Sequence, residues 1–117
     1  MAYKIFDLKD GMPCTLFHGV NGSRRLPLDR WLTAERKMVR DGSGQGRYVS
    51  GFHAYESMED VRAWAKGAKN LDNRVVAQVG VRGCRSKPRA VRTTILADRL
   101  RITSDDWGRR VALKEVL

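Results

Sequence analysis

Valine or alanine occupies every second position between Val75 and Arg82, at positions 75, 77, 79 and 81. This is the most regular alternation in the chain. This period of two predicts a strand with one buried face. Residues that favour β-structure, bounded by turn signals such as KDG and NGS, predict further strands elsewhere in the chain. These segments are Tyr3–Leu8, Cys14–Val20, Arg47–Tyr55, Ala90–Leu96 and Leu100–Ile102.

Apolar residues at helical spacing predict helices between these strands. The first helix is expected to follow a cap at Asp29, with apolar positions at Trp31, Leu32, Met38 and Val39. The second follows the S-x-x-D cap of Ser57–Asp60, and the third follows TSDD, Thr103–Asp106. The order of elements is then β-β-α-β-α-β-β-α. We therefore expect an α+β fold, with a mixed or mainly antiparallel sheet and about three flanking helices.

The length of 117 residues and the hydrophobic content of 42% suit one core, so a single domain over residues 1–117 is expected. No apolar run approaches the length of a membrane span, and MAYKIFDLKD lacks the apolar stretch of a signal peptide. These features predict a cytoplasmic protein without a membrane partner.

Each tryptophan falls on a predicted helix, where core packing is expected rather than base stacking: Trp31, Trp64 and Trp107.

Candidate metal ligands and nucleophiles are few. The two cysteines, Cys14 and Cys84, show no C-x-x-C spacing, and with His18 and His53 they do not form the closely spaced ligand pairs of structural zinc sites. No G-x-S-x-G elbow occurs. We expect two reduced thiols and no metal.

Positive charge is the most informative chemical feature. Lys and Arg number 23 against 13 Asp and Glu, which gives a net charge of +10. The segment VRGCRSKPRAVR places five cations and no anion on two predicted strands and their connection: Arg82, Arg85, Lys87, Arg89 and Arg92. Arginine presents a planar fork to phosphate and lysine a point charge, so this cationic face is expected to bind an anionic partner. Alternatively, these charges only keep an edge strand solvated and prevent aggregation.

Two short motifs carry a family resemblance. TLFHGV, read together with GRYVSGFHAYESMEDVRAWAKG, resembles the His-Tyr-Glu branch of the ADP-ribosyltransferase fold. The resemblance implies that His18 and Gly19 would hold the nicotinamide ribose and amide of NAD, and that Tyr48 would stack on the nicotinamide. Asp98, in LADRLRI, is the nearest counterpart of the family's catalytic glutamate and is one methylene shorter.

The stretch GFHAYESMEDVRAW, followed by the valine-rich strand and LADRLRI, also looks like small accessory proteins of bacterial viruses. That resemblance implies attachment to host nucleic-acid machinery or to a defence complex.

Two hypotheses follow. One is a basic binding or regulatory protein that needs no cofactor and docks through its cationic face on nucleic acid, an acidic host protein or a ribonucleoprotein. The other is an ADP-ribosyltransferase-like enzyme or nucleotide-binding domain that uses NAD. Under either, the glycine-rich loop Asp41–Gly46 is expected to be mobile and to border the functional surface.

Overall fold

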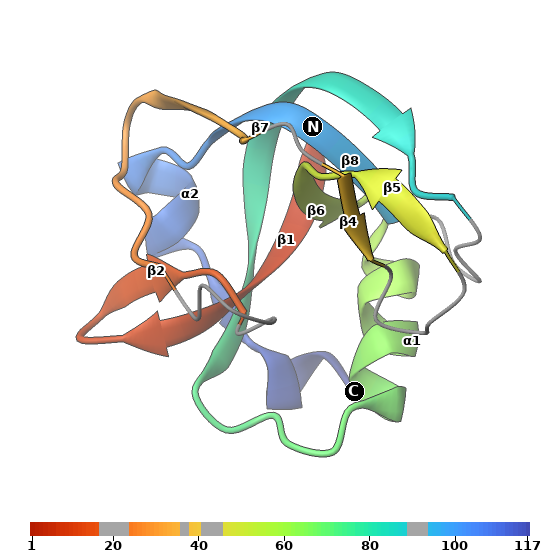
Figure 1. Cartoon of the computed structure of the whole chain (residues 1–117). Coiled ribbons are helices and arrows are strands. Elements are labelled where there is room, and N and C mark those ends of the chain that lie inside the picture. Colours follow the sequence, from red (N-terminus) through yellow and green to blue (C-terminus); the bar gives the residue numbers. More distant parts are fainter. Residues whose placement is uncertain (17–23, 36–37, 41–45, 89–93) are drawn as a thin grey trace.

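A curved antiparallel sheet forms most of the structure, a computed structural model that describes residues 1–16, 24–35, 38–40, 46–88 and 94–117 (Figure 1). Its strands are β1 (Ala2–Lys9), β2 (Met12–Cys14), β3 (Trp31–Thr33), β6 (Phe52–Tyr55), β7 (Arg74–Ser86), β8 (Thr94–Arg101) and β9 (Val111–Ala112). A small second sheet pairs β4 (Met38–Arg40) with β5 (Arg47–Val49). The helical elements among the described residues are α1 (Met58–Gly67), α2 (Ser104–Gly108) and the 3-10 helix η2 (Leu113–Val116).

Strand β7 organises this sheet because it is long and bends along its length (Figure 1). Its first half, up to Val79, pairs with β1, and its second half, from Gly80, pairs with β8. Strand β6 pairs with both β8 and β1. The four strands β1, β6, β8 and β7 therefore close into a ring.

Two hydrophobic clusters lie on opposite sides of this ring. The first contains residues of all four ring strands, with Phe6 against Trp107 of α2 in an edge-to-face contact of 5.6 Å, and is enclosed by the ring. The second lies outside, where Ile5 and Val76 pack with Val61 of α1. Neighbouring residues on β1 and β7 thus point to different clusters, as a period of two requires.

Helix α1 begins where its cap predicts. The Ser57 hydroxyl accepts a hydrogen bond from the Asp60 amide at 3.2 Å, which satisfies a donor that would otherwise be unpaired at the helix N-terminus. Glu59 and Asp60 in the first turn complement the helix dipole. Val61 and Ala65, one turn apart, are buried against the sheet.

The predicted helix after Asp29 is wrong, and so is the expectation of an α+β fold with about three flanking helices. Only α1 and the five-residue α2 are α-helices within the described residues. Trp31–Thr33 instead forms β3, which pairs with β8, and the Ala34 amide bonds to the Asp98 carbonyl at 2.8 Å. Asp29 adopts a positive φ of 62° and its carboxylate accepts a hydrogen bond from the Ser104 amide at the start of α2. The unpaired edge of β8 therefore outweighs the local helical pattern.

Other sequence-based boundaries shift in smaller ways. The strand predicted over Arg47–Tyr55 is divided into β5 and β6, and the strand predicted between Val75 and Arg82 continues in β7 as far as Ser86. The continuation of the predicted Cys14–Val20 strand beyond residue 16, and residues 41–45 of the glycine-rich loop, lie outside the described residues. Cys14 is a buried free thiol and Cys84 an exposed one. None of the described helices has the length and apolar character needed to cross a membrane.

Candidate nucleic-acid interface

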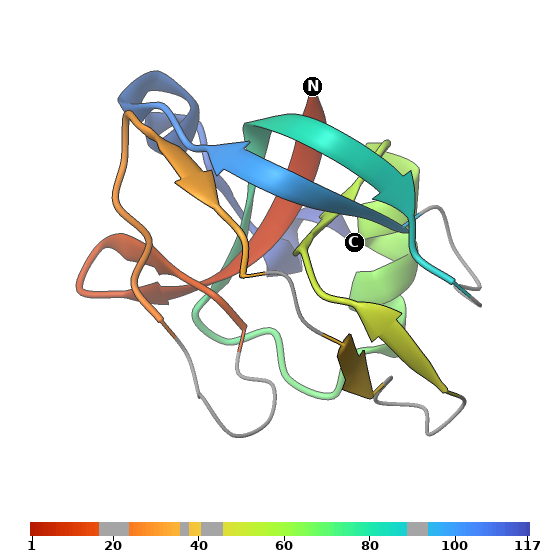
Figure 2. The same cartoon turned by 45° about the horizontal axis from the view of Figure 1, so that its top comes forward.

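Strands β3, β8 and β7 lie side by side and expose one face of the sheet (Figure 2). Leu32, Leu100 and Val81 occupy matching positions on the three strands and pack against the enclosed core cluster. The residues on either side of this row therefore point outward. They form two further rows, Trp31 with Arg101 and Gly80, and Thr33 with Arg99 and Arg82. We call these six residues the Trp31 face.

Three arginines of the Trp31 face gather around its single aromatic ring. The guanidinium carbon of Arg82 is 4.1 Å from the centroid of the Trp31 ring, that of Arg101 is 5.2 Å away and that of Arg99 is 5.5 Å away. All three arginines are exposed, whereas the indole is half-buried. The result is an aromatic surface surrounded by forked hydrogen-bond donors.

Acidic side chains leave this charge largely uncompensated. No carboxylate of the described residues lies within ion-pair distance of Arg82, Arg99 or Arg101. Asp29 lies near Arg101, but hydrogen bonds from Ser104 are the main cause of its lowered pKa, and the charge of Arg101 adds a smaller effect. The Trp31 face is therefore strongly positive.

The three guanidinium groups share the indole as a common contact. Because each guanidinium carbon lies within 5.5 Å of the same centroid, any two are at most about 11 Å apart, close to the Debye length at moderate salt. Two unit charges in water repel each other by about 0.4 kcal/mol at 11 Å and by about 1 kcal/mol at 4 Å. An exposed cation–π contact contributes about 0.5–1 kcal/mol, so the indole offsets part of the repulsion between the arginines, and an anion would offset more of it.

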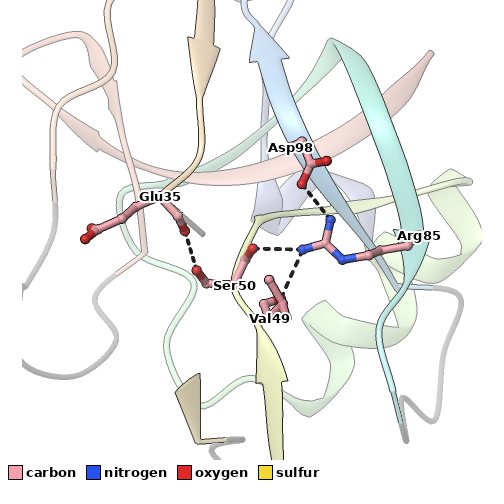
Figure 3. A network of polar contacts seen from close by, with 5 residues as sticks. All are labelled: Glu35, Val49, Ser50, Arg85 and Asp98. Atoms are coloured by element: carbon pink, nitrogen blue, oxygen red, sulfur yellow. Dashed lines mark hydrogen bonds and ion pairs between the residues drawn. The ribbon is translucent and has the colours of Figure 1, made fainter. Parts of the chain in front are cut away.

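Arg85, also predicted to bind anions, has a different role in the structure (Figure 3). Its guanidinium donates to the Asp98 carboxylate at 2.7 Å and to the carbonyl oxygens of Val49 and Ser50 at 3.1 and 2.8 Å. The Ser50 hydroxyl in turn donates to the Glu35 carbonyl. Arg85 therefore ties the connection between β5 and β6 to β7 and β8.

Lys87 and Tyr48 form a second contact between a cation and an aromatic ring. The Lys87 ammonium lies 5.2 Å from the centroid of the Tyr48 ring, and the Tyr48 hydroxyl is 3.3 Å from Nε2 of His53. The carbonyl of His53 accepts a hydrogen bond of 2.6 Å from the buried ammonium of Lys4. Burial lowers the pKa of Lys4 from 10.5 to about 8.

The structure distributes the predicted cationic residues over several places. Arg82 belongs to the Trp31 face, Arg85 to the Asp98 network and Lys87 to the Tyr48 pair, while Arg89 and Arg92 lie outside the described residues. Sequence reasoning missed that Trp31, Arg99 and Arg101 join Arg82. The spacing of Arg99 and Arg101 on one strand was a signal, but β3 had first to be identified as a strand.

The residues of the proposed NAD site are only partly described. His18, Gly19 and Val20 lie outside the described residues. Tyr48 contacts His53 and Lys87, and Asp98 forms an ion pair with Arg85. The ADP-ribosyltransferase-like hypothesis therefore stays a prediction. In the described part of the chain, no three histidine, cysteine or acidic side chains gather closely enough to hold a metal ion.

Comparison with known proteins identified no relative of this protein. No family model matches the sequence, and no curated protein or solved structure matches it either. The Trp31 face is therefore interpreted from its own charge and chemistry.

Proposed function

We propose that this protein is a small basic binding protein that docks on nucleic acid through the Trp31 face. The supporting observation is the gathering of Arg82, Arg99 and Arg101 around one indole, without a carboxylate partner among the described residues. A phosphate backbone would neutralise these charges together and release its condensed counterions, which drives binding. The resemblance to accessory proteins of bacterial viruses extends the proposal to a target within host nucleic-acid machinery or a defence complex.

Nucleic acid suits this face better than an acidic protein because it offers both charge and aromatic rings. The arginine forks match phosphate oxygens, and the indole can contact a base. Aspartate and glutamate side chains would use the arginines but leave the aromatic ring without an equivalent partner. An acidic protein would instead bind with a fixed one-to-one stoichiometry.

The experiment compares two variants that lose the same charge. In the first, Arg82, Arg99 and Arg101 are replaced by Gln, which keeps part of each side chain over the indole. In the control, the exposed cations Arg62, Lys66 and Lys69, on and just after α1, are replaced by Gln. Fluorescence anisotropy with labelled single-stranded and duplex oligonucleotides is measured between about 50 and 200 mM salt.

For the unmodified protein, three neutralised phosphates predict a slope of log affinity against log salt of about −2 on a single strand or −3 on a duplex. The arginine variant should lose most of its affinity and most of this slope, whereas the control should keep both. Equal losses in the two variants would reduce the effect to net charge and contradict a localised site. The absence of salt-dependent binding by the unmodified protein would overturn the proposed function.

A further inference from the structure

The side chain of Trp31 extends across the sheet rather than away from it. Trp31 is on β3 and pairs with Arg101 on β8, which in turn pairs with Gly80 on β7. A Cβ atom at Gly80 would lie 3.5 Å from Cη2 of Trp31 and 3.9 Å from Cβ of Arg101. The indole therefore spans the intervening strand and reaches the space that the missing side chain of Gly80 leaves open.

This arrangement makes the Trp31 face broad and low. It spans three neighbouring strands, whereas the major groove of a duplex admits an α-helix or a ribbon of two strands. A paired base keeps its ring stacked inside the duplex, so it cannot lie on an aromatic side chain of such a surface. An unpaired base can, and proteins that bind single strands combine aromatic platforms with surrounding cations in this way.

We infer that the Trp31 face selects single-stranded nucleic acid, with one base stacked against the Trp31–Arg82 pair and the neighbouring phosphates held by Arg99 and Arg101. This inference rests on the proposed function and specifies its substrate class. The contact of 4.1 Å between Arg82 and the indole supports it, because a guanidinium stacked on an aromatic ring provides a planar surface for a base. Gly80 has a positioning role, since a larger residue there would displace the ring.

The test measures how well unlabelled oligonucleotides displace a labelled oligonucleotide from the protein. The competitors are a single strand and a duplex of the same sequence. At equal salt, the single strand should bind at least about tenfold more tightly than the duplex, and it should quench tryptophan emission. Trp31→Leu should weaken single-strand binding by about tenfold or more and abolish most of the quenching, and Trp31→Phe should retain most of the affinity. The melting temperature of each variant establishes that it is folded.

If Trp31→Leu does not fold, Gly80→Leu takes its place, because displacement of the indole should weaken single-strand binding and reduce the preference for the single strand. Equal or tighter binding of the duplex overturns the inference, and so does single-strand binding that is unchanged when the aromatic ring is removed in Trp31→Leu or displaced in Gly80→Leu. In either case, nucleic-acid binding that is lost when Arg82, Arg99 and Arg101 are replaced would still support the proposed function. Failure of the unmodified protein to bind either strand form overturns the proposed function itself.

Discussion

Trp31 and Gly80 lie on strands that do not pair with each other, yet the ring of Trp31 ends where a side chain of Gly80 would begin. A methyl group at Gly80 would make ordinary contacts, the nearest being 3.5 Å from Cη2 of Trp31, whereas a longer side chain would overlap the ring. The size of residue 80 should therefore decide where the indole lies.

We accordingly expect Gly80→Ala to bind single-stranded DNA with nearly unchanged affinity and Gly80→Leu to bind it about tenfold more weakly. Both variants leave the charge of the protein unchanged, so electrostatic attraction is held constant. Tryptophan emission should shift to longer wavelength in the leucine variant as the indole becomes more exposed. Similar affinities of the two variants would show that the indole position does not matter for binding.

Glycine is required at position 83 for two reasons, its backbone conformation and its close approach to Asp98. Its φ is +64°, and a Cβ there would lie 2.8 Å from Oδ2 and 2.9 Å from Cβ of Asp98. Gly83→Ala should lower the free energy of unfolding by about 1–3 kcal/mol, because it combines a strained conformation with a close contact. Gly67→Ala is the control, since nothing lies within 4 Å of its added Cβ. Chemical denaturation measures both, and equal stabilities of the two variants would contradict the prediction.

The sequence was sufficient to predict elements whose signals are local. Ser57 and Thr103 each accept a hydrogen bond from the amide three residues later, and both helices begin there. The alternation from Val75 onward predicted a strand, and β7 contains it, but Val76 on the face expected to be exposed is also buried, in the cluster beside α1. Such features depend on neighbours within a few residues, so they can be inferred without the fold.

Tertiary pairing determined what the sequence alone could not. The segment from Asp29 to Val39 has apolar residues at helical spacing, but Trp31–Thr33 completes the edge of β8, about seventy positions further along the chain. Once Trp31 was placed on a helix, its contacts with Arg82 and Arg101 could not be anticipated. The sequence therefore predicted that the candidate site is a cationic surface, but among the residues of the Trp31 face it identified only Arg82.

Arg85 should behave differently from the arginines of the Trp31 face, because its guanidinium already has three protein acceptors. Arg85→Gln should lower the free energy of unfolding by about 1–2 kcal/mol, a value that allows for the partial exposure of the ion pair. Asp98→Asn should have a similar effect, and the double variant should lose less than the sum. Strictly additive losses in denaturation experiments would show that the two side chains are not coupled.

The ADP-ribosyltransferase-like hypothesis makes a separate prediction about NAD. Incubation of the protein with labelled NAD and a cell lysate should give labelled products that disappear in His18→Ala and Tyr48→Ala. Tyr48→Phe is a useful comparison, since it removes the hydroxyl near His53 but keeps the ring beneath Lys87. If neither labelling nor NAD binding by calorimetry occurs with the unmodified protein, this hypothesis is eliminated while nucleic-acid binding is unaffected.

The buried ammonium of Lys4 should make stability depend on alkaline pH. Lys4 lies between Ala2 and Phe6 on β1, both in the enclosed core cluster, and desolvation lowers its pKa from 10.5 to about 8. Below pH 8 the amine is protonated in both the folded and the unfolded chain. Between pH 8 and 10.5 the unfolded chain binds a proton that the folded chain lacks, so the free energy of unfolding rises with pH.

The full rise should be about 3 kcal/mol, since each unit of pKa corresponds to about 1.4 kcal/mol. Lys4→Met keeps the length of the side chain and removes the charge, so the variant should be more stable at neutral pH by about 1–2 kcal/mol, the loss of the hydrogen bond to His53 offsetting part of the gain. Denaturant unfolding from pH 7 to 10 should show the stability curves of the original and variant proteins converging as pH increases and then crossing, because the rise of about 3 kcal/mol in the original protein exceeds its initial deficit. Lys66→Met, at an exposed position, is the control and should run parallel to the original. A constant difference between the Lys4→Met and original curves would mean that Lys4 titrates alike in the folded and unfolded chains.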